Sequence, residues 1–183
     1  MKKEQKTGIG LTDWDRECMA WHEAGHAVCA LVLPESTPVL RVSIVPGDDA
    51  FGLMCRAPRP HHNETERSLR TSISILLAGG ISERLFLKRK TTSPADDIRN
   101  ANQIACNMVF QFGMGRRTKW FSVPIAMEKT GASIRDADAD MRDILDDSAK
   151  ETECILIEHA DFVRLLALRL LAEGTIHSPE LLK

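Results

Sequence analysis

The residues best suited to chemistry are a glutamate and two histidines in the run His22-Glu23-Ala24-Gly25-His26. In a helix, side chains four residues apart share one face, with Cβ atoms roughly 5 to 6 Å apart. This spacing lets both imidazoles reach one tetrahedral zinc ion through bonds of about 2.0 to 2.1 Å. Glu23 would lie near an open coordination position, where a carboxylate takes the proton of a zinc-bound water and then protonates the leaving amine. The motif therefore predicts zinc-dependent hydrolysis, with His22 and His26 as metal ligands and Glu23 as the general base.

A simpler interpretation of the motif is a pair of core histidines. A histidine on an apolar helix face is more often a hydrogen-bonded core residue than a metal ligand. Here, however, three polar side chains would enter a face flanked by Trp21, Val28 and Cys29. Burying all three without a partner is costly, so we favour the metal site.

A catalytic zinc site needs a third protein ligand and one open position, whereas a structural site needs four protein ligands. No histidine stands six residues after His26, and the glutamate considered on a later helix is Glu83. The adjacent His61 and His62 lie in a proline-rich loop and are expected to be solvated. The candidates for the third ligand are Glu83, Asp96, Asp97, His61, His62 and His159.

Local chemistry separates the aspartates. Ser93 fits the N-cap of a helix and Pro94 its first position. Asp96 then takes the third position, where a capping-box carboxylate is engaged with backbone N–H groups. Asp97 is free of that task, and Glu83 lies one turn past a glycine pair. The residues alone leave Asp97 and Glu83 as equal alternatives.

Around the motif the sequence predicts one long helix followed by a β-hairpin. Apolar residues recur at near-helical spacing from 12 to 33, and Pro34 ends the helix. β-Branched residues from 39 to 45, turn residues 46–49 and an apolar run from 51 to 57 predict two paired strands.

Most of the remaining chain is predicted to be helical. The expected helices cover 65–88, 93–113 and 133–173, the last broken near 159–161. The pair Gly79-Gly80 costs about 1 kcal/mol per glycine relative to alanine inside a helix, so another backbone is expected to approach closely there. We predict a mainly α fold with a small β-hairpin or sheet, as one domain over 13–183 after a flexible arm over 1–12.

Bulk composition argues against several functional classes. Lys plus Arg total 24 and Asp plus Glu total 26, a formal net charge of −2, so no nucleic-acid partner is expected. No apolar run reaches the roughly 18 to 20 residues of a membrane span, and no signal peptide begins the sequence. The five cysteines contain no CxxC pair, which favours reduced core cysteines in a cytoplasmic protein.

Four ordered blocks of sequence carry a family resemblance. They are HEAGHAV with LPESTPVLRVSIVPGDDAFGLM, then LLAGGISERLF, then TTSPADDIRNANQIACNMVFQFGMG, and LLALRLLAEGTIHSPELL. Together they resemble the peptidase domain of the FtsH-type ATP-dependent zinc metalloproteases. The resemblance implies a mainly helical, zincin-like peptidase domain that binds Zn²⁺ and hydrolyses unfolded or flexible polypeptides.

The resemblance also implies roles for single residues. His22 and His26 match the two zinc-binding histidines of the family, and the aspartate of the third block falls on Asp97, implying that it is the third ligand. Glu83 matches a glutamate of the second block and is expected to support the site. By analogy, the substrate adds as an extended strand along Phe51, Gly52, Leu53, Met54 and Cys55.

The sequence departs from the family in two respects. Members normally carry an ATPase module and membrane-spanning segments, but no G-x-x-x-x-G-K-[ST] motif occurs here. Gly80 also stands where the second block usually has an arginine. We therefore expect a metallo-endopeptidase without a motor in this chain, acting alone or with a separate ATPase chain, and with a homo-oligomer as one option. The alternative is a non-proteolytic binding or regulatory module that keeps the peptidase fold.

Overall fold

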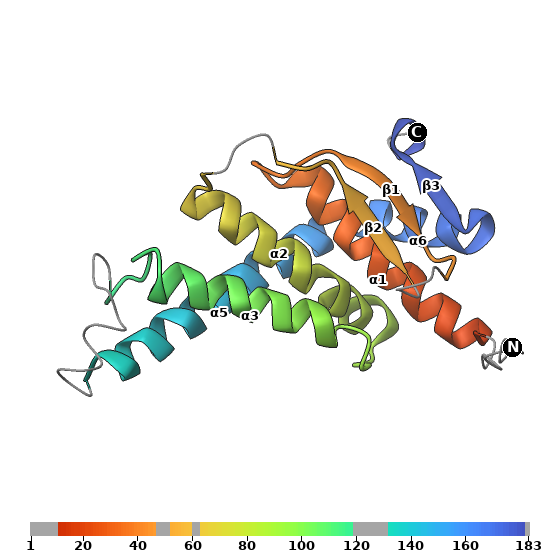
Figure 1. Ribbon diagram of the computed structural model, residues 1–183. Coiled ribbons are helices and arrows are strands. Elements are labelled where there is room, and N and C mark those ends of the chain that lie inside the picture. The colour runs from red at the N-terminus through yellow and green to blue at the C-terminus, as the bar shows by residue number, and fades with distance from the viewer. Residues whose placement is uncertain (1–10, 47–51, 60–62, 119–131, 182–183) are drawn as a thin grey trace, which may run out of the picture.

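The computed structural model describes residues 11–46, 52–59, 63–118 and 132–181. Its helices are α1 (Asp13–Val32), α2 (Glu66–Ser82), η1 (Glu83–Leu87, a π-helical turn), α3 (Ala95–Phe110), α5 (Ala132–Glu158), α6 (Ala160–Glu173) and η2 (Ser178–Glu180, a 3₁₀ turn). Its strands are β1 (Val39–Ser43), β2 (Leu53–Arg56) and β3 (Thr175–His177). The prediction of a mainly helical fold with a small sheet is confirmed (Figure 1).

The helix that carries the H-E-x-x-H motif is closely packed against α2. Thr12, the final residue of the predicted arm, caps α1 by accepting from the backbone N–H of Asp15. Where the two helices cross, a Cβ on Gly25 would lie 2.6 Å from both the carbonyl oxygen of Ala78 and the Cβ of Ser82. Ser82 also donates its hydroxyl proton to the backbone carbonyl of Trp21 at 2.6 Å. The missing side chain of Gly25 therefore permits the close approach of α1 and α2.

Helix α2 separates two apolar clusters. The first lies between α1, the sheet and α6, and includes Val28, Val42 and Leu170. The second lies between α2, α3 and α5, and includes Ile73 and Met108. Figure 1 shows α2 between α1 and α3, with α5 passing behind it. This central position lets α2 support the motif on α1 from one side and receive α3 from the other.

The sheet has the strand order β2-β1-β3, and both pairings are antiparallel. The predicted hairpin is confirmed, with Val42 opposite Met54. The third strand was not predicted: Ile176 pairs with Val42 from the other side. Because β3 has three residues, it is too short to show the alternation that identifies a strand. Strand β2 is thus an edge strand among the described residues, and in Figure 1 it lies over α1.

The start of α3 differs from its prediction. The capping box expected from Ser93 and Asp96 was wrong, because Pro94 occupies the cap position and makes no side-chain cap bond. The backbone N–H of Ser93 instead donates to the hydroxyl of Thr91, and Asp96 forms an exposed ion pair with Arg99. Asp96 therefore takes no part in capping.

The predicted helix boundaries are otherwise close to those observed. The α-helix expected over 65–88 ends at Ser82 and continues as the wider turn η1, after which Lys88 adopts a left-handed conformation. The break expected near 159–161 is confirmed, since His159 separates α5 from α6. None of the helices in the described ranges is both long and apolar enough to cross a membrane.

The five cysteines are all outside disulfides. Cys18 and Cys29 are buried, and burial raises the pKa of their thiols to about 11 and about 12 respectively. Cys55 and Cys106 are partly exposed and Cys154 is exposed. The prediction of core cysteines therefore holds for two of the five.

The close approach at Gly25 leads to a stability test. In an unobstructed helix, Gly→Ala stabilises by up to about 1 kcal/mol. Because the added Cβ would meet the backbone of α2, we expect Gly25→Ala to destabilise the protein by about 1 to 3 kcal/mol, the usual effect of overpacking. Urea denaturation measures this change. A more stable Gly25→Ala protein would contradict the close crossing.

Candidate metal centre

The H-E-x-x-H side chains lie on the buried face of α1, against α2. His22, Glu23 and His26 are 5%, 6% and 6% exposed. A Cβ on Gly79 would lie 2.5 Å from Nε2 of His22 and 2.6 Å from Nε2 of His26. Close approach was predicted at this glycine, but two imidazole rings, rather than a backbone, occupy the space that it leaves.

Each imidazole is oriented through its Nδ1 atom. Nδ1 of His22 donates to Oε1 of Glu83 at 2.7 Å, and Nδ1 of His26 donates to the backbone carbonyl of Ile75 at 2.6 Å. Because a carboxylate and a carbonyl only accept, we assign the proton of each neutral ring to Nδ1. Both Nε2 atoms then present lone pairs, as in a metal-binding histidine.

Asp97, in the first turn of α3, brings a third acceptor atom to the two Nε2 atoms. Its Oδ2 lies 3.1 Å from Nε2 of His22 and 3.4 Å from Nε2 of His26, and the two nitrogens are 2.9 Å apart. A tetrahedral zinc ion with bonds of about 2.0 to 2.1 Å holds its ligand atoms about 3.3 Å apart. The spacing and the donor types therefore fit zinc. Within the described residues, no fourth His, Cys, Asp or Glu joins this group, which leaves room for an open coordination position.

The electrostatics of the cluster favour a positive charge at its centre. Burial alone would lower the pKa of His22, but hydrogen bonds to Asp97 and Glu83 outweigh burial and raise the pKa to about 9. Burial alone would raise the pKa of Asp97, yet hydrogen bonds with His22 and His26 bring that pKa well below its usual range. In the metal-free protein, a proton therefore supplies the charge that a cation would otherwise bring.

Glu83 lies behind His22, on the side of the ring away from the cluster. It is fully buried at the start of η1, a type of turn that is frequent at functional sites. Its Oε1 accepts from His22, and its Oε2 accepts from the hydroxyl of Thr91 at 2.5 Å. Of the two alternatives for the third ligand, Asp97 thus lies in the cluster, whereas Glu83 orients an imidazole.

A cavity of about 600 Å³ contains the cluster and Glu23. Burial raises the pKa of Glu23, against the opposing charges of His26 and His22. Gly52, the residue before β2, packs against this carboxylate, since a Cβ there would lie 2.7 Å from Oε1 of Glu23. The lining residues are Met19, His22, Glu23, His26, Gly52, Leu53, Met54, Arg56, Ile75, Leu76, Ser93, Asp96 and Asp97.

The predicted substrate strand is only partly beside this cavity. Gly52, Leu53 and Met54 line it, whereas Cys55 does not. Cys55 lies opposite Arg41 in the hairpin and accepts a weak hydrogen bond from that side chain. Phe51 lies outside the described residues.

The other predicted candidates for the third ligand are not in the cluster. Asp96 lines the cavity, but its carboxylate is exposed and pairs with Arg99 at 2.7 Å. His159 lies between α5 and α6 and does not join the group. His61 and His62 lie outside the described residues.

Two contributors to the site were missed by sequence reasoning. The Ile75 carbonyl gives no side-chain signal, because any residue at that position would supply it. Thr91 precedes α3 in a run of hydroxyl residues, which is a pattern typical of helix caps rather than of metal sites. Its bond to Glu83 depends on how the segment before α3 packs against η1.

The adjacent aspartates of α3 provide a matched test of the third ligand. We expect Asp97→Asn to weaken zinc binding by roughly hundredfold or more. The loss of a residue that only orients a ligand already lowers metal affinity by about 10- to 100-fold, and the loss of a ligand should cost at least as much. Asp96→Asn should leave the affinity unchanged, because its carboxylate faces solvent. Competition against a chromophoric chelator measures both. Equal affinities of the two variants would contradict the assignment of Asp97.

The raised pKa of His22 makes the stability of the metal-free protein depend on pH. A histidine whose pKa rises from 6.5 to about 9 on folding stabilises the protein fully below pH 6.5 and loses that effect as the pH rises through 9. We expect the unfolding free energy of chelator-treated protein to fall by about 2 to 3 kcal/mol between about pH 6 and 9.5. Urea denaturation measures this fall, which should be smaller in His22→Gln. The same fall in both proteins would contradict the raised pKa.

Several known proteases are similar to this chain. A component of the mitochondrial inner membrane m-AAA protease, AFG3L2 of Mus musculus, is 30% identical over 188 residues, covering 98% of this chain and 23% of that protein. The ATP-dependent zinc metalloprotease FtsH of Acidobacterium capsulatum is 28% identical, covering 99% of this chain and 30% of that protein. FtsH of Thermobaculum terrenum is 37% identical over 107 residues, covering 58% of this chain and 17% of that protein.

The chain thus spans less than a third of the length of these relatives. The resemblance to FtsH-type proteases is confirmed by these similarities and by a family model. The model of peptidase family M41 matches residues 10–183, a range that includes His22, Glu23, His26 and Asp97. The chain therefore belongs to peptidase family M41.

Proposed function

We propose that this chain is a zinc metallo-endopeptidase that hydrolyses peptide bonds in unfolded or flexible polypeptides. Membership of peptidase family M41 and the FtsH-type relatives support peptide hydrolysis in general. The observation that carries the finer proposal is the meeting of three acceptor atoms, from His22, His26 and Asp97, in the cavity that also contains Glu23.

In this proposal each residue around the cluster has a separate task. His22, His26 and Asp97 would hold zinc, which when bound would polarise the scissile carbonyl and make the attacking water more acidic. Glu23 takes the proton from the water. Because burial raises the pKa of Glu23, this carboxyl can keep the proton and then deliver it to the leaving amine. Glu83 and Thr91 hold the ring of His22 in the orientation that binding requires.

The edge of β2 supports an extended polypeptide as substrate. Among the described residues, β2 pairs with β1 alone, so the backbone groups of its other edge are available to a further strand. Gly52 and Leu53 place this edge beside Glu23 in the cavity wall. A folded protein does not offer a free extended segment, which is why the proposal specifies unfolded or flexible substrates.

The hydrolytic step proposed here requires no nucleotide. The FtsH relatives are named as ATP-dependent, but the 183 residues contain no G-x-x-x-x-G-K-[ST] motif. We propose that delivery of folded substrates depends on an ATPase partner, while flexible ones are cleaved without it. A homo-oligomer and a cytoplasmic location stay predictions.

Glu23→Gln tests the catalytic assignment. The substitution keeps the shape of the side chain but removes its ability to take a proton. We expect the variant to bind one zinc per chain and to lose casein cleavage by roughly 10²- to 10⁴-fold, the usual contribution of a general base. Metal analysis and a fluorescent casein assay without ATP measure the two properties.

Glu17→Gln is the matched control, since Glu17 is an exposed residue of the same helix; this variant should cleave casein at the wild-type rate. Undiminished cleavage by Glu23→Gln would refute the role of Glu23. If the unaltered protein binds zinc and cleaves nothing, the non-proteolytic binding module is the better description.

A further inference from the structure

The cavity around the cluster contains a cation for which the proposed hydrolysis has no use. Arg56, the last residue of β2, is the one Lys or Arg among the described lining residues. Near the metal ligands the lining is acidic, with Glu23, Asp96 and Asp97, whereas Met54, Ile75 and Leu76 add apolar walls. The cavity therefore combines a hydrolytic centre, apolar surface and a guanidinium group.

The guanidinium of Arg56 has no counter-charge within the described residues. Its Nη1 atom is buried without a hydrogen-bond partner, and no carboxylate of the described ranges forms an ion pair with it. Burial and the nearby charge of Arg59 both lower the pKa of Arg56, as expected where a positive charge is poorly compensated. Arg56 as a whole is half-buried, and a charge that is partly removed from water without a partner is unfavourable and is relieved by an anion.

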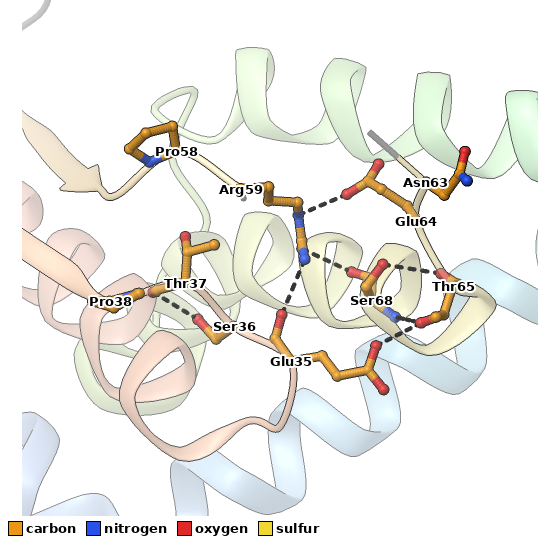
Figure 2. Close-up of a pocket in the computed structure, with 10 residues that line it drawn as sticks. All are labelled: Glu35, Ser36, Thr37, Pro38, Pro58, Arg59, Asn63, Glu64, Thr65 and Ser68. Carbon is orange, nitrogen blue, oxygen red and sulfur yellow. Dashed lines mark hydrogen bonds and ion pairs between the residues drawn. The ribbon is translucent and has the colours of Figure 1, made fainter. Parts of the chain in front are cut away.

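The acidic side chains near Arg59 are already engaged. Arg59 pairs with Glu64 at 2.6 Å, and its guanidinium also donates to the backbone carbonyl of Glu35. The carboxylate of Glu35 accepts from the hydroxyl of Thr65 at 2.5 Å. Figure 2 shows these contacts around a separate cavity of about 350 Å³. Neither glutamate is therefore free to compensate Arg56.

The geometry of β2 sets the distance between Arg56 and the reacting bond. Gly52 packs against the carboxylate of Glu23, and Arg56 follows four residues later along an extended strand. At about 3.3 Å per residue, the two positions are about 13 Å apart. A substrate paired along this edge would therefore present to Arg56 a residue about three to five positions from the scissile bond.

We propose that Arg56 forms a subsite for a carboxylate of the polypeptide substrate, at this distance from the scissile bond. This inference rests on the proposed function and specifies its substrate class. Met54 of β2 lies between Gly52 and Arg56, and with Ile75 and Leu76 it gives the cavity apolar walls that favour apolar side chains in the substrate. The carboxylate comes either from an internal Asp or Glu or from the C-terminus of the substrate, since a guanidinium pairs with both in the same way.

The test uses the zinc-loaded chain and quenched fluorescent peptides that differ at one position. Glu, Gln and Lys are compared at each position within six residues of the cleaved bond, and each peptide is made with a free and an amidated C-terminus. We expect Glu over Gln to raise kcat/KM about tenfold at one position, three to five residues from the bond. An effect that requires the free C-terminus assigns the carboxylate to the chain end.

Variants of Arg56 link this preference to the residue. In Arg56→Met the ratio of kcat/KM for the Glu and Gln peptides should fall to about one. In Arg56→Lys the ratio should stay above one but below the wild-type value. In Arg56→Glu the peptide with Lys should be preferred. The control is Arg41→Met, because Arg41 is exposed and opposite Cys55 on the other face of the hairpin; this variant should keep the wild-type ratio. The same ratio in wild type and Arg56→Met, or no preference at any position, overturns the proposal.

Binding measurements separate this inference from the proposed function. If the zinc-loaded protein cleaves no peptide, the proposed hydrolysis fails, and the same peptides are then tested for binding by fluorescence anisotropy. The subsite still requires the Kd for the Glu peptide to be about tenfold lower than for the Gln peptide, with the difference lost in Arg56→Met. Equal Kd values, or no binding at all, overturn the subsite as well.

Discussion

The Nε2 atoms of His22 and His26 and the Oδ2 atom of Asp97 lie within 3.4 Å of one another, and the rest of the site is arranged around this contact, which needs a positive charge. Two imidazole lone pairs and a carboxylate repel one another unless a positive charge lies between them. The fold nevertheless holds them together through the Nδ1 bonds and the burial of both rings. In the metal-free protein a proton on His22 supplies that charge. A cation that binds here would replace the proton, which couples metal affinity to pH and to stability.

The supporting groups on α2 and η1 follow a simple spacing. The Ile75 carbonyl, the open space at Gly79 and the Glu83 carboxylate occur at intervals of four residues, as do the two histidines of α1. Residues four apart lie along one ridge of a helix. The crossing of α1 over α2 thus positions both imidazoles at once. His26 meets the Ile75 carbonyl, His22 meets the Glu83 carboxylate, and both rings fill the space beside Gly79. The close contact at Gly25 positions both the apolar core and the histidine pair, so a change in this helix crossing alters both.

Sequence reasoning succeeded where the information was local. The periodicity of residues 12–33 placed His22, Glu23 and His26 on one helix face, and turn chemistry indicated the hairpin. Prediction from the sequence was weaker for residues whose roles depend on how distant elements pack together. From the sequence, Asp97 and Glu83 were equal alternatives for the third metal ligand. Their different positions depend on how α3 and η1 pack beside α1. The capping role of Asp96 was wrong because Thr91, held by Glu83, already binds the N–H of Ser93. No local pattern contains that contact.

The pairing of β3 with β1 has a consequence for the order in which the chain matures. Ser43 and Thr175, whose hydroxyl groups lie 2.7 Å apart, are 132 residues apart in the chain. During synthesis, the helix with the motif leaves the ribosome before α6, and the sheet beside it lacks a strand until α6 and β3 have also emerged. Contacts between such distant segments form slowly, because a long loop must first be closed. A nascent chain therefore carries the histidines and the glutamate of the motif before β1 gains its second neighbour, and the sheet that includes β2 is complete only after α6 and β3 have been translated.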